Sequence, residues 1–158
     1  MPVGIAIRYL PMQQETEAEL IIRAKVDDIM DVIADLPSYP LWCPGVSRAD
    51  VLQTFDNGRP KEVLMVLDSG PIHDTLQYVY DWSTKNEVQW WQTQGETLKS
   101  LKGRYSCRRL GHNQTLVSYM LTIELAMPMI SALQRRAEKH IVSTALEGLK
   151  HRVEELSA

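Results

Sequence analysis

Apolar and polar residues alternate through the middle of the chain, in runs typical of strands that bury one face. Residues 46–123 contain six such runs. Turn-forming triplets lie between runs at Asp56-Asn57-Gly58, Thr84-Lys85-Asn86, Gln94-Gly95-Glu96 and Gly111-His112-Asn113. The pattern predicts six consecutive antiparallel strands, and the Ile- and Leu-rich segment 17–25 predicts an earlier first strand.

The alternation also indicates which side chains face the core. Residues of one parity are aromatic or aliphatic, while polar residues fill much of the other parity. The expected inward positions are Tyr78, Tyr80, Trp82, Val88, Trp90, Leu101, Tyr105, Cys107, Val117, Tyr119, Leu121 and Ile123. One face of the sheet is therefore expected to meet water and the other the core.

A helical period precedes these strands. Ile29, Ile33 and Leu36 recur at helical spacing, and Asp27 and Asp28 place negative charge where the dipole of a first turn favours it. Three prolines then break the helix, at Pro37, Pro40 and Pro44. Because residues 39–42 are too apolar for a solvated loop, they are expected to form a bent second helical turn on the sheet.

A long helical pattern follows Pro128, which suits a first helical position. Its apolar stripe consists of Ile130, Leu133, Ala137, Ile141, Ala145, Leu149, Val153 and Leu156. Charged residues such as Arg135, Glu138 and Lys139 fall mostly on other faces. We expect the stripe to lie across the concave face of the sheet. Because a strongly twisted sheet curves away from a straight helix, one helix cannot fill the concavity, and we expect an apolar hollow between them.

Residues 33–46 (IADLPSYPLWCPGV) resemble the D-x-x-x-Y-x-x-W segment of the polyketide cyclase/dehydrase and coenzyme Q-binding branches of the START-like (SRPBCC) superfamily, with Asp35, Tyr39 and Trp42 at the matching positions. Segments 78–80, 88–90, 101–105 and 115–119 are similar to strand signatures of these proteins, in the same order. The resemblance, closest in type to actinobacterial proteins, covers about residues 17–156. It implies an α+β helix-grip fold, with a seven-stranded curved antiparallel sheet around a long C-terminal helix.

Composition agrees with a single globular domain. The 158 residues are 44% hydrophobic and 23% charged, with a formal net charge of −3. This acidic balance argues against a nucleic-acid partner, and no segment is apolar enough for stable membrane insertion. We expect residues 1–16 to be an N-terminal tail and residues 17–158 one domain. Cys43 and Cys107 match no metal or redox spacing, so we expect reduced, partly buried thiols in the cytoplasm.

The sequence offers few candidates for catalysis. His73 and Asp74 are adjacent in a strand and point to opposite faces, so we expect an exposed, unpaired pair rather than a dyad. The remaining histidines form no ligand cluster, and we expect no metal, no cofactor and no catalytic residue. Met127, Met129 and Ile130 could form an apolar lip over the mouth of the cavity, or belong to the core.

The expected function is binding or transport of a hydrophobic small molecule, such as a lipid, polyketide or quinone, by a monomer or homodimer. The expected ligand-binding residues are Trp42, Tyr78, Tyr80, Trp90, Leu101, Tyr105, Tyr119, Leu133, Ala137 and Ile141. A second hypothesis is a polyketide cyclase or dehydrase in which a cavity tyrosine donates a proton. The third, taken from the resemblance, is an interaction module similar to ribosome-associated toxins.

Overall fold

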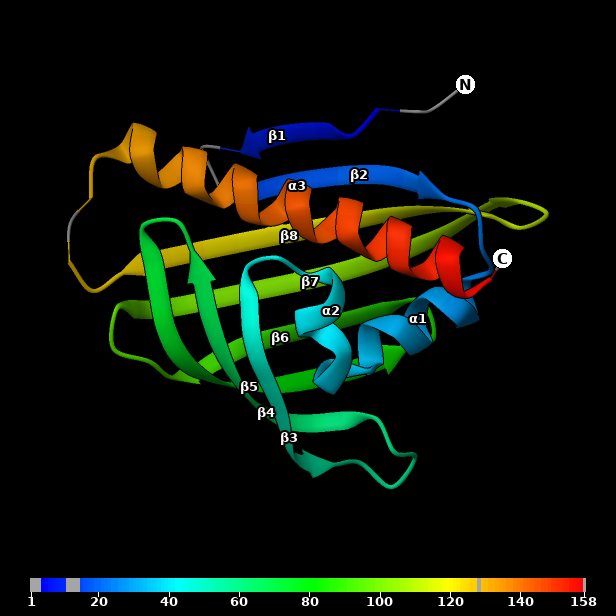
Figure 1. The fold of residues 1–158 in the computed structure, drawn as a ribbon, viewed down its shortest axis with the longest axis horizontal. Helices are drawn as coiled ribbons and strands as arrows, with labels where there is room; N and C mark the ends of the chain where they lie inside the picture. Colours follow the sequence, from blue (N-terminus) through cyan, green and yellow to red (C-terminus); the bar gives the residue numbers. More distant parts are fainter. Residues whose placement is uncertain (1–3, 11–14, 128, 158) are drawn as a thin grey trace.

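A computed structural model describes residues 4–10, 15–127 and 129–157, which form one curved antiparallel sheet with helices on its concave side (Figure 1). The strands are β1 (Ala6–Leu10), β2 (Glu15–Ile22), β3 (Val46–Thr54), β4 (Pro60–Ser69), β5 (Ile72–Thr84), β6 (Glu87–Gln94), β7 (Leu98–Gly111) and β8 (Gln114–Leu125), in the spatial order β1-β2-β8-β7-β6-β5-β4-β3. The helices are α1 (Val26–Ala34), the 3-10 turn η1 (Leu36–Ser38), α2 (Tyr39–Trp42) and α3 (Ser131–Leu156). The predicted α+β architecture with six consecutive strands is confirmed.

The sheet has eight strands, one more than the sequence predicted. Residues 6–10 fall in the expected tail, yet they form β1 and pair with β2, where Arg8 lies opposite Glu17. The Arg8 guanidinium donates to that carboxylate at 2.7 and 3.0 Å. Three of the five residues of β1 are exposed, so this edge strand carries no alternation that the sequence could reveal. The expected first strand, residues 17–25, is β2 at Glu15–Ile22.

The predicted inner face of the sheet is confirmed by burial. Tyr78 and Tyr105 are only 2% exposed, and Leu121 and Ile123 of β8 are buried beside them. Trp82 is half-buried because it lies near the end of β5, where its indole N–H donates to the carbonyl of Pro60 at 2.7 Å. Cys43 and Cys107 are both free thiols and both buried.

The long helix α3 packs along one side of the concave face, against β2 and β8, rather than over its centre (Figure 1). The middle of its predicted stripe is buried, including Ala145 and Leu149. The beginning is not, since Ile130 is 77% exposed and Leu133 is 41% exposed. Helical periodicity identifies a face but not how much of its length a sheet covers. Pro128, the expected first helical residue, lies outside the described residues.

The short helices close the part of the concave face that α3 leaves uncovered. The Tyr39 hydroxyl donates to the carbonyl of Ile33 at 2.6 Å and so joins α2 to α1. The Tyr39 ring also packs on Trp42, with 4.6 Å between the ring centroids. On the other side, a Cβ atom at Gly148 of α3 would lie 2.0 Å from the backbone oxygen of Trp42. The backbone of α2 therefore rests directly on α3, at a position where only glycine fits.

The close contact between Gly148 and the Trp42 carbonyl predicts how a substitution at residue 148 changes stability. Replacing glycine by alanine inside a helix ordinarily stabilises it by about 0.5–1 kcal/mol. At this position we expect Gly148→Ala to destabilise the protein by about 1–3 kcal/mol, because the new methyl group would overlap the Trp42 carbonyl. Thermal unfolding followed by circular dichroism should show a decrease in Tm of about 3–10 °C.

The matched control is Glu147→Ala, at the exposed neighbouring position of the same helix. We expect its Tm to stay close to that of the wild type. Equal Tm values for the two variants would show that α2 does not need this close approach.

Candidate functional site: an enclosed aromatic cavity

An enclosed cavity lies between the sheet, α2 and α3. Its walls are Tyr39, Cys43, Gly45, Val46, Met65, Leu67, Tyr78, Tyr80, Trp90, Leu101, Tyr105, Tyr119, Leu121, Ile141, Thr144 and Ala145. The centre of a water-sized sphere can move through about 40 Å³ of it, whereas roughly 10–15 Å³ is enough for one water molecule. The cavity is thus small, but the aromatic side chains do not close it completely.

Aromatic rings form a continuous network along the cavity. Trp90 stacks on Tyr80 with 5.8 Å between centroids, and Tyr119 meets the edge of Trp90 at 5.6 Å. Tyr105 and Tyr119 contact each other edge to face at 4.6 Å. The indole ring of Trp90 lies directly on the backbone of β7 because the residue opposite it is Gly103. A Cβ atom at this position would come within 2.2 Å of the ring. The result is an aromatic wall in which stacked and edge-to-face rings alternate.

Seven of the ten residues expected from the sequence line this cavity: Tyr78, Tyr80, Trp90, Leu101, Tyr105, Tyr119 and Ile141. The other three do not. Trp42 is buried against Tyr39 and α3, Ala137 is buried outside the cavity, and Leu133 is exposed. Met65 and Leu67 of β4 also line the cavity but were not among the expected residues, although their alternation along the strand places both on its buried face. As ligand-binding residues, all of these remain a prediction.

The lining of the cavity carries no formal charge. None of its residues is Asp, Glu, Lys, Arg or His. Burial is the main cause that raises the pKa values of Tyr78, Tyr80, Tyr105 and Tyr119 above the ordinary value of 10.0. Burial also raises the pKa of the Cys43 thiol to about 12. At neutral pH these groups are therefore protonated and neutral.

A family model described as polyketide cyclase / dehydrase and lipid transport matches residues 22–150. The chain belongs to this family. No protein with a curated description matches it in sequence. The family includes cyclases as well as lipid-transport proteins, so membership leaves the activity open.

Solved structures similar to this family member share its fold. A START superfamily protein from Mycobacterium smegmatis has a TM-score of 0.84 at 20% identity, covering 90% of this chain and 98% of that one. The Zhui aromatase/cyclase from Streptomyces sp. R1128 has a TM-score of 0.78 at 12% identity, covering 97% of each chain. A STAR-related lipid transfer protein from Xanthomonas axonopodis has a TM-score of 0.69 at 14% identity, covering 95% of this chain and 92% of its own. These likenesses confirm the helix-grip fold.

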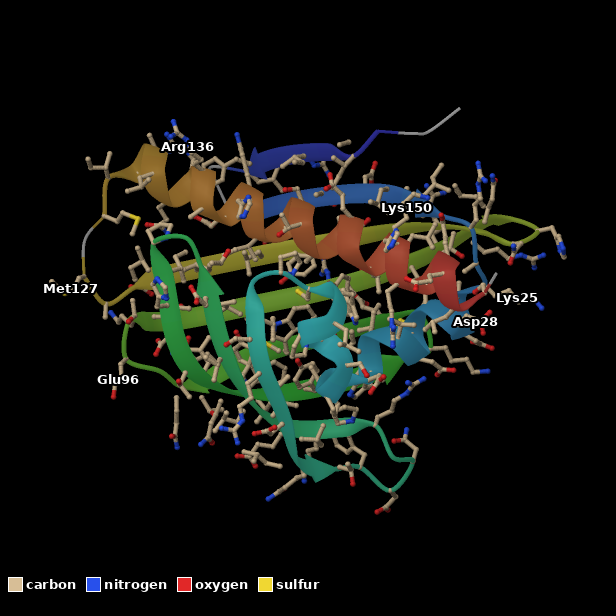
Figure 2. The ribbon with its side chains drawn as sticks, viewed as in Figure 1. Lys25, Asp28, Glu96, Met127, Arg136 and Lys150 are labelled. Carbon is tan, nitrogen blue, oxygen red and sulfur yellow. The ribbon has the colours of Figure 1, made fainter. Side chains whose placement is uncertain are left out.

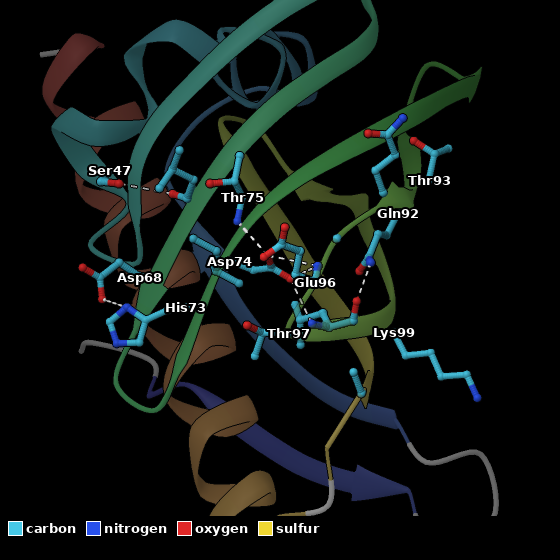
Figure 3. A pocket seen from close by; sticks show the side chains of 16 residues that line it. Ser47, Asp68, His73, Asp74, Thr75, Gln92, Thr93, Glu96, Thr97 and Lys99 are labelled. Carbon is cyan, nitrogen blue, oxygen red and sulfur yellow. Dashed lines mark hydrogen bonds and ion pairs between the residues drawn. The ribbon is translucent and has the colours of Figure 1, made fainter.

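A second, much wider groove lies at one end of the sheet, beside Asp74 (Figure 3). The volume of this groove is about 1090 Å³, but it is open to solvent and its walls are mostly polar. Asp74 precedes the part of β5 that pairs with β6. Its carboxylate accepts backbone N–H groups of Thr75 at 2.9 Å, Glu96 at 3.0 Å and Leu98 at 2.9 Å. Residue 74 has no pairing partner on β6, and its carboxylate instead binds the backbone of the turn between β6 and β7.

The predicted exposure of His73 is confirmed, but the expectations that Asp74 is exposed and that both residues are unpaired are wrong. Asp74 is half-buried and has the three backbone donors just described. His73 is exposed, and its Nδ1 lies 2.9 Å from a carboxylate oxygen of Asp68. The two side chains have separate partners because adjacent strand residues point in opposite directions.

The apolar lip predicted before α3 does not contribute to the cavity wall. Met127 lies on the loop at the outer end of the molecule (Figure 2) and, like Ile130, is 77% exposed. Neither residue lines the cavity or belongs to the buried core. Among the described residues, no group of three or more His, Cys, Asp or Glu side chains is placed to hold a metal. No helix in the described parts of the chain is both long and apolar enough to cross a membrane.

Glu138 is a buried exception to the prediction that the charged residues of α3 lie mostly on other faces, which its other charged residues follow. It is 2% exposed, and its carboxylate accepts a hydrogen bond from Thr16 of β2 at 3.5 Å. Burial raises the pKa of Glu138 to about 7, and this effect is partly offset by hydrogen bonds from Gln134 and Thr16 and by the charge of Arg135. Glu138 lies beside Ile123 and outside the aromatic cavity.

The raised pKa of Glu138 predicts a pH-dependent stability. A group whose folded pKa exceeds its ordinary value of 4.5 stabilises the fold fully below pH 4.5, and this contribution is lost as the pH rises through about 7. Glu138→Gln, which stays neutral, should therefore raise the Tm by about 3–6 °C at pH 8 and leave it nearly unchanged at pH 4.5. The gain is limited because hydrogen bonds from Gln134 and Thr16 and the charge of Arg135 already offset part of the cost of the ionised form.

The control for this experiment is Glu147→Gln on the exposed face of α3. Its Tm should follow that of the wild type at both pH values. If Glu138→Gln raised the Tm equally at low and high pH, the effect would not come from titration of this carboxylate.

The role of Asp74 predicts a local loss of order when the carboxylate is removed. Hydrogen bonds to a charged acceptor contribute about 1.5–3 kcal/mol in favourable cases, so we expect Asp74→Ala to cost about 1–3 kcal/mol in this half-buried setting. Amide hydrogen exchange at Glu96 and Leu98 should become faster, as measured by mass spectrometry. Asp81→Ala, at an exposed position of the same strand, should leave these amides protected. Unchanged protection in Asp74→Ala would contradict the assignment.

Proposed function

We propose that this protein binds a hydrophobic small molecule, such as a lipid, a polyketide or a quinone, in the enclosed aromatic cavity. The observation that carries the proposal is a buried space walled by aromatic and aliphatic side chains with no charged residue among them. Removing apolar ligand surface from water contributes roughly 25 cal/mol per Å². Affinity can therefore arise from burial alone, without a catalytic group.

The protonation states of the cavity argue for a binder or carrier rather than an enzyme. General acid–base catalysis works best when the pKa of the catalytic group lies near the working pH. Burial raises the pKa values of the tyrosine hydroxyls and of the Cys43 thiol further above neutral pH, so these groups are poorer acids and bases for catalysis. His73 and Asp74 line the outer groove and not the cavity. Cyclase activity, suggested by the name of the similar Streptomyces protein, thus has no evident acid or base in the cavity.

Occupancy of the purified protein tests the proposal directly. Native mass spectrometry should show a protein carrying one small apolar molecule, and extraction with organic solvent should release it for identification. A binder that loses its guest during purification should regain one when incubated with a lipid extract. Failure to find any guest under both conditions would argue against a binding function.

A cavity-filling variant locates the guest. Ala145 lines the cavity from α3, so Ala145→Val and Ala145→Leu should progressively remove space and lower the bound fraction, by about tenfold for leucine. Ala132→Leu, on an exposed position of the same helix, is the matched control and should bind like the wild type. Thermal unfolding checks that each variant is folded. Equal occupancy in the wild type and Ala145→Leu would place the guest elsewhere.

A further inference from the structure

Four tyrosines of the cavity have hydroxyl groups that form no hydrogen bond with any described residue. Two other aromatic residues follow the usual rule for buried polar groups: Tyr39 donates to a carbonyl oxygen at 2.6 Å and Trp82 to another at 2.7 Å. Within the described part of the chain, no hydrogen bond forms at the hydroxyls of four residues that are 2–7% exposed, namely Tyr78, Tyr80, Tyr105 and Tyr119. Such buried, unpaired polar groups require an explanation.

These hydroxyls are not sealed inside the protein. Among the described residues, the fully enclosed side-chain atoms without a hydrogen bond are Trp42 Nε1, Gln92 Oε1 and Arg104 Nε, the last of which lies 3.2 Å from a carboxylate oxygen of Glu87. The tyrosine hydroxyls are not among them, and all four rings line the cavity. Their polar ends therefore border the free space, where a bound molecule can reach them.

Tyr119 occupies the centre of this group. Its ring contacts Trp90 at 5.6 Å and Tyr105 at 4.6 Å. After burial, its proximity is among the causes that raise the pKa values of Tyr78, Tyr80 and Tyr105. The four tyrosines therefore line one common cavity, with Tyr119 in ring contact with two of its other aromatic residues.

The same space excludes a charged guest. An anion moved into the cavity would lose its hydration without meeting a cation, because the lining contains no lysine, arginine or histidine. A cation would meet no carboxylate there, for the same reason. The carboxylates of Asp74 and Glu138 border other pockets and not this cavity.

We infer that the cavity selects a compact, uncharged ring compound that carries a hydrogen-bond-accepting oxygen, such as a carbonyl group, which the hydroxyl of Tyr119 binds with the help of its neighbours. The aromatic walls favour a planar ring over a long chain. This inference rests on the proposed function, since it specifies which hydrophobic molecules the cavity prefers.

Three probes of nearly the same shape separate the contributions of charge and oxygen: acetophenone, cumene and benzoate. All contain one benzene ring and the same number of non-hydrogen atoms, but only acetophenone is both neutral and an acceptor. Isothermal titration calorimetry of the wild-type protein should show acetophenone binding about 3- to 10-fold tighter than cumene, as one hydrogen bond provides. Benzoate should bind at least about 100-fold more weakly than acetophenone.

Two variants assign the effect to the tyrosine hydroxyls. Tyr119→Phe should reduce acetophenone to the affinity of cumene and leave the affinity of cumene nearly unchanged. Tyr9→Phe, at a ring that lies outside the cavity under the guanidinium of Arg135, should retain the wild-type preference. If Tyr119→Phe does not fold, Tyr80→Phe removes a neighbouring hydroxyl and should weaken acetophenone selectively.

The possible outcomes separate this inference from the function on which it rests. A protein that binds cumene as tightly as acetophenone, or that accepts benzoate equally well, overturns the preference but still has an apolar binding cavity. A preference for acetophenone that persists in both Tyr119→Phe and Tyr80→Phe overturns the role of the hydroxyls. A wild-type protein that binds none of the three probes and carries no guest after lipid incubation overturns the proposed function itself.

Discussion

The backbone contact between α2 and α3 at Gly148 determines how the concave face of this sheet is closed. Because α3 packs on β2 and β8, it cannot also cover the strands farther along the sheet. The segment η1–α2 covers that region, tied to α1 through the Tyr39 hydroxyl and resting on Gly148 through the Trp42 carbonyl. The space left between this segment, α3 and the sheet is the aromatic cavity.

Enclosure explains the distribution of charge. Desolvation makes an ion costly inside such a space, so its ionisable groups are weak acids that stay neutral. Two half-buried or buried carboxylates, those of Asp74 and Glu138, lie outside the cavity in different surroundings. Asp74 is surrounded by backbone N–H donors, and Glu138 has a pKa close to neutrality because burial disfavours its ionised form.

The family fold provides the cavity, and the lining determines what the cavity can do. Proteins named as lipid-transfer protein and as aromatase/cyclase share this architecture with the present chain at low sequence identity. A cyclase must supply a positioned acid or base in addition to an apolar space. The aromatic and neutral lining described here meets the requirement for binding, while its tyrosine hydroxyls supply polar specificity.

The order of the long elements, the parity of the strands and the aromatic face of the sheet could all be predicted from the amino-acid pattern. Alternation was sufficient to bring Tyr78, Trp90 and Tyr119 to the cavity, because successive strand residues must point to opposite faces. Local periodicity does not encode how far one element extends over another. Only the tertiary structure exposed Leu133, buried Glu138 and turned Trp42 away from the cavity. Those outcomes depend on contacts between segments far apart in the chain, as do the pairing of β1 and the role of Asp74.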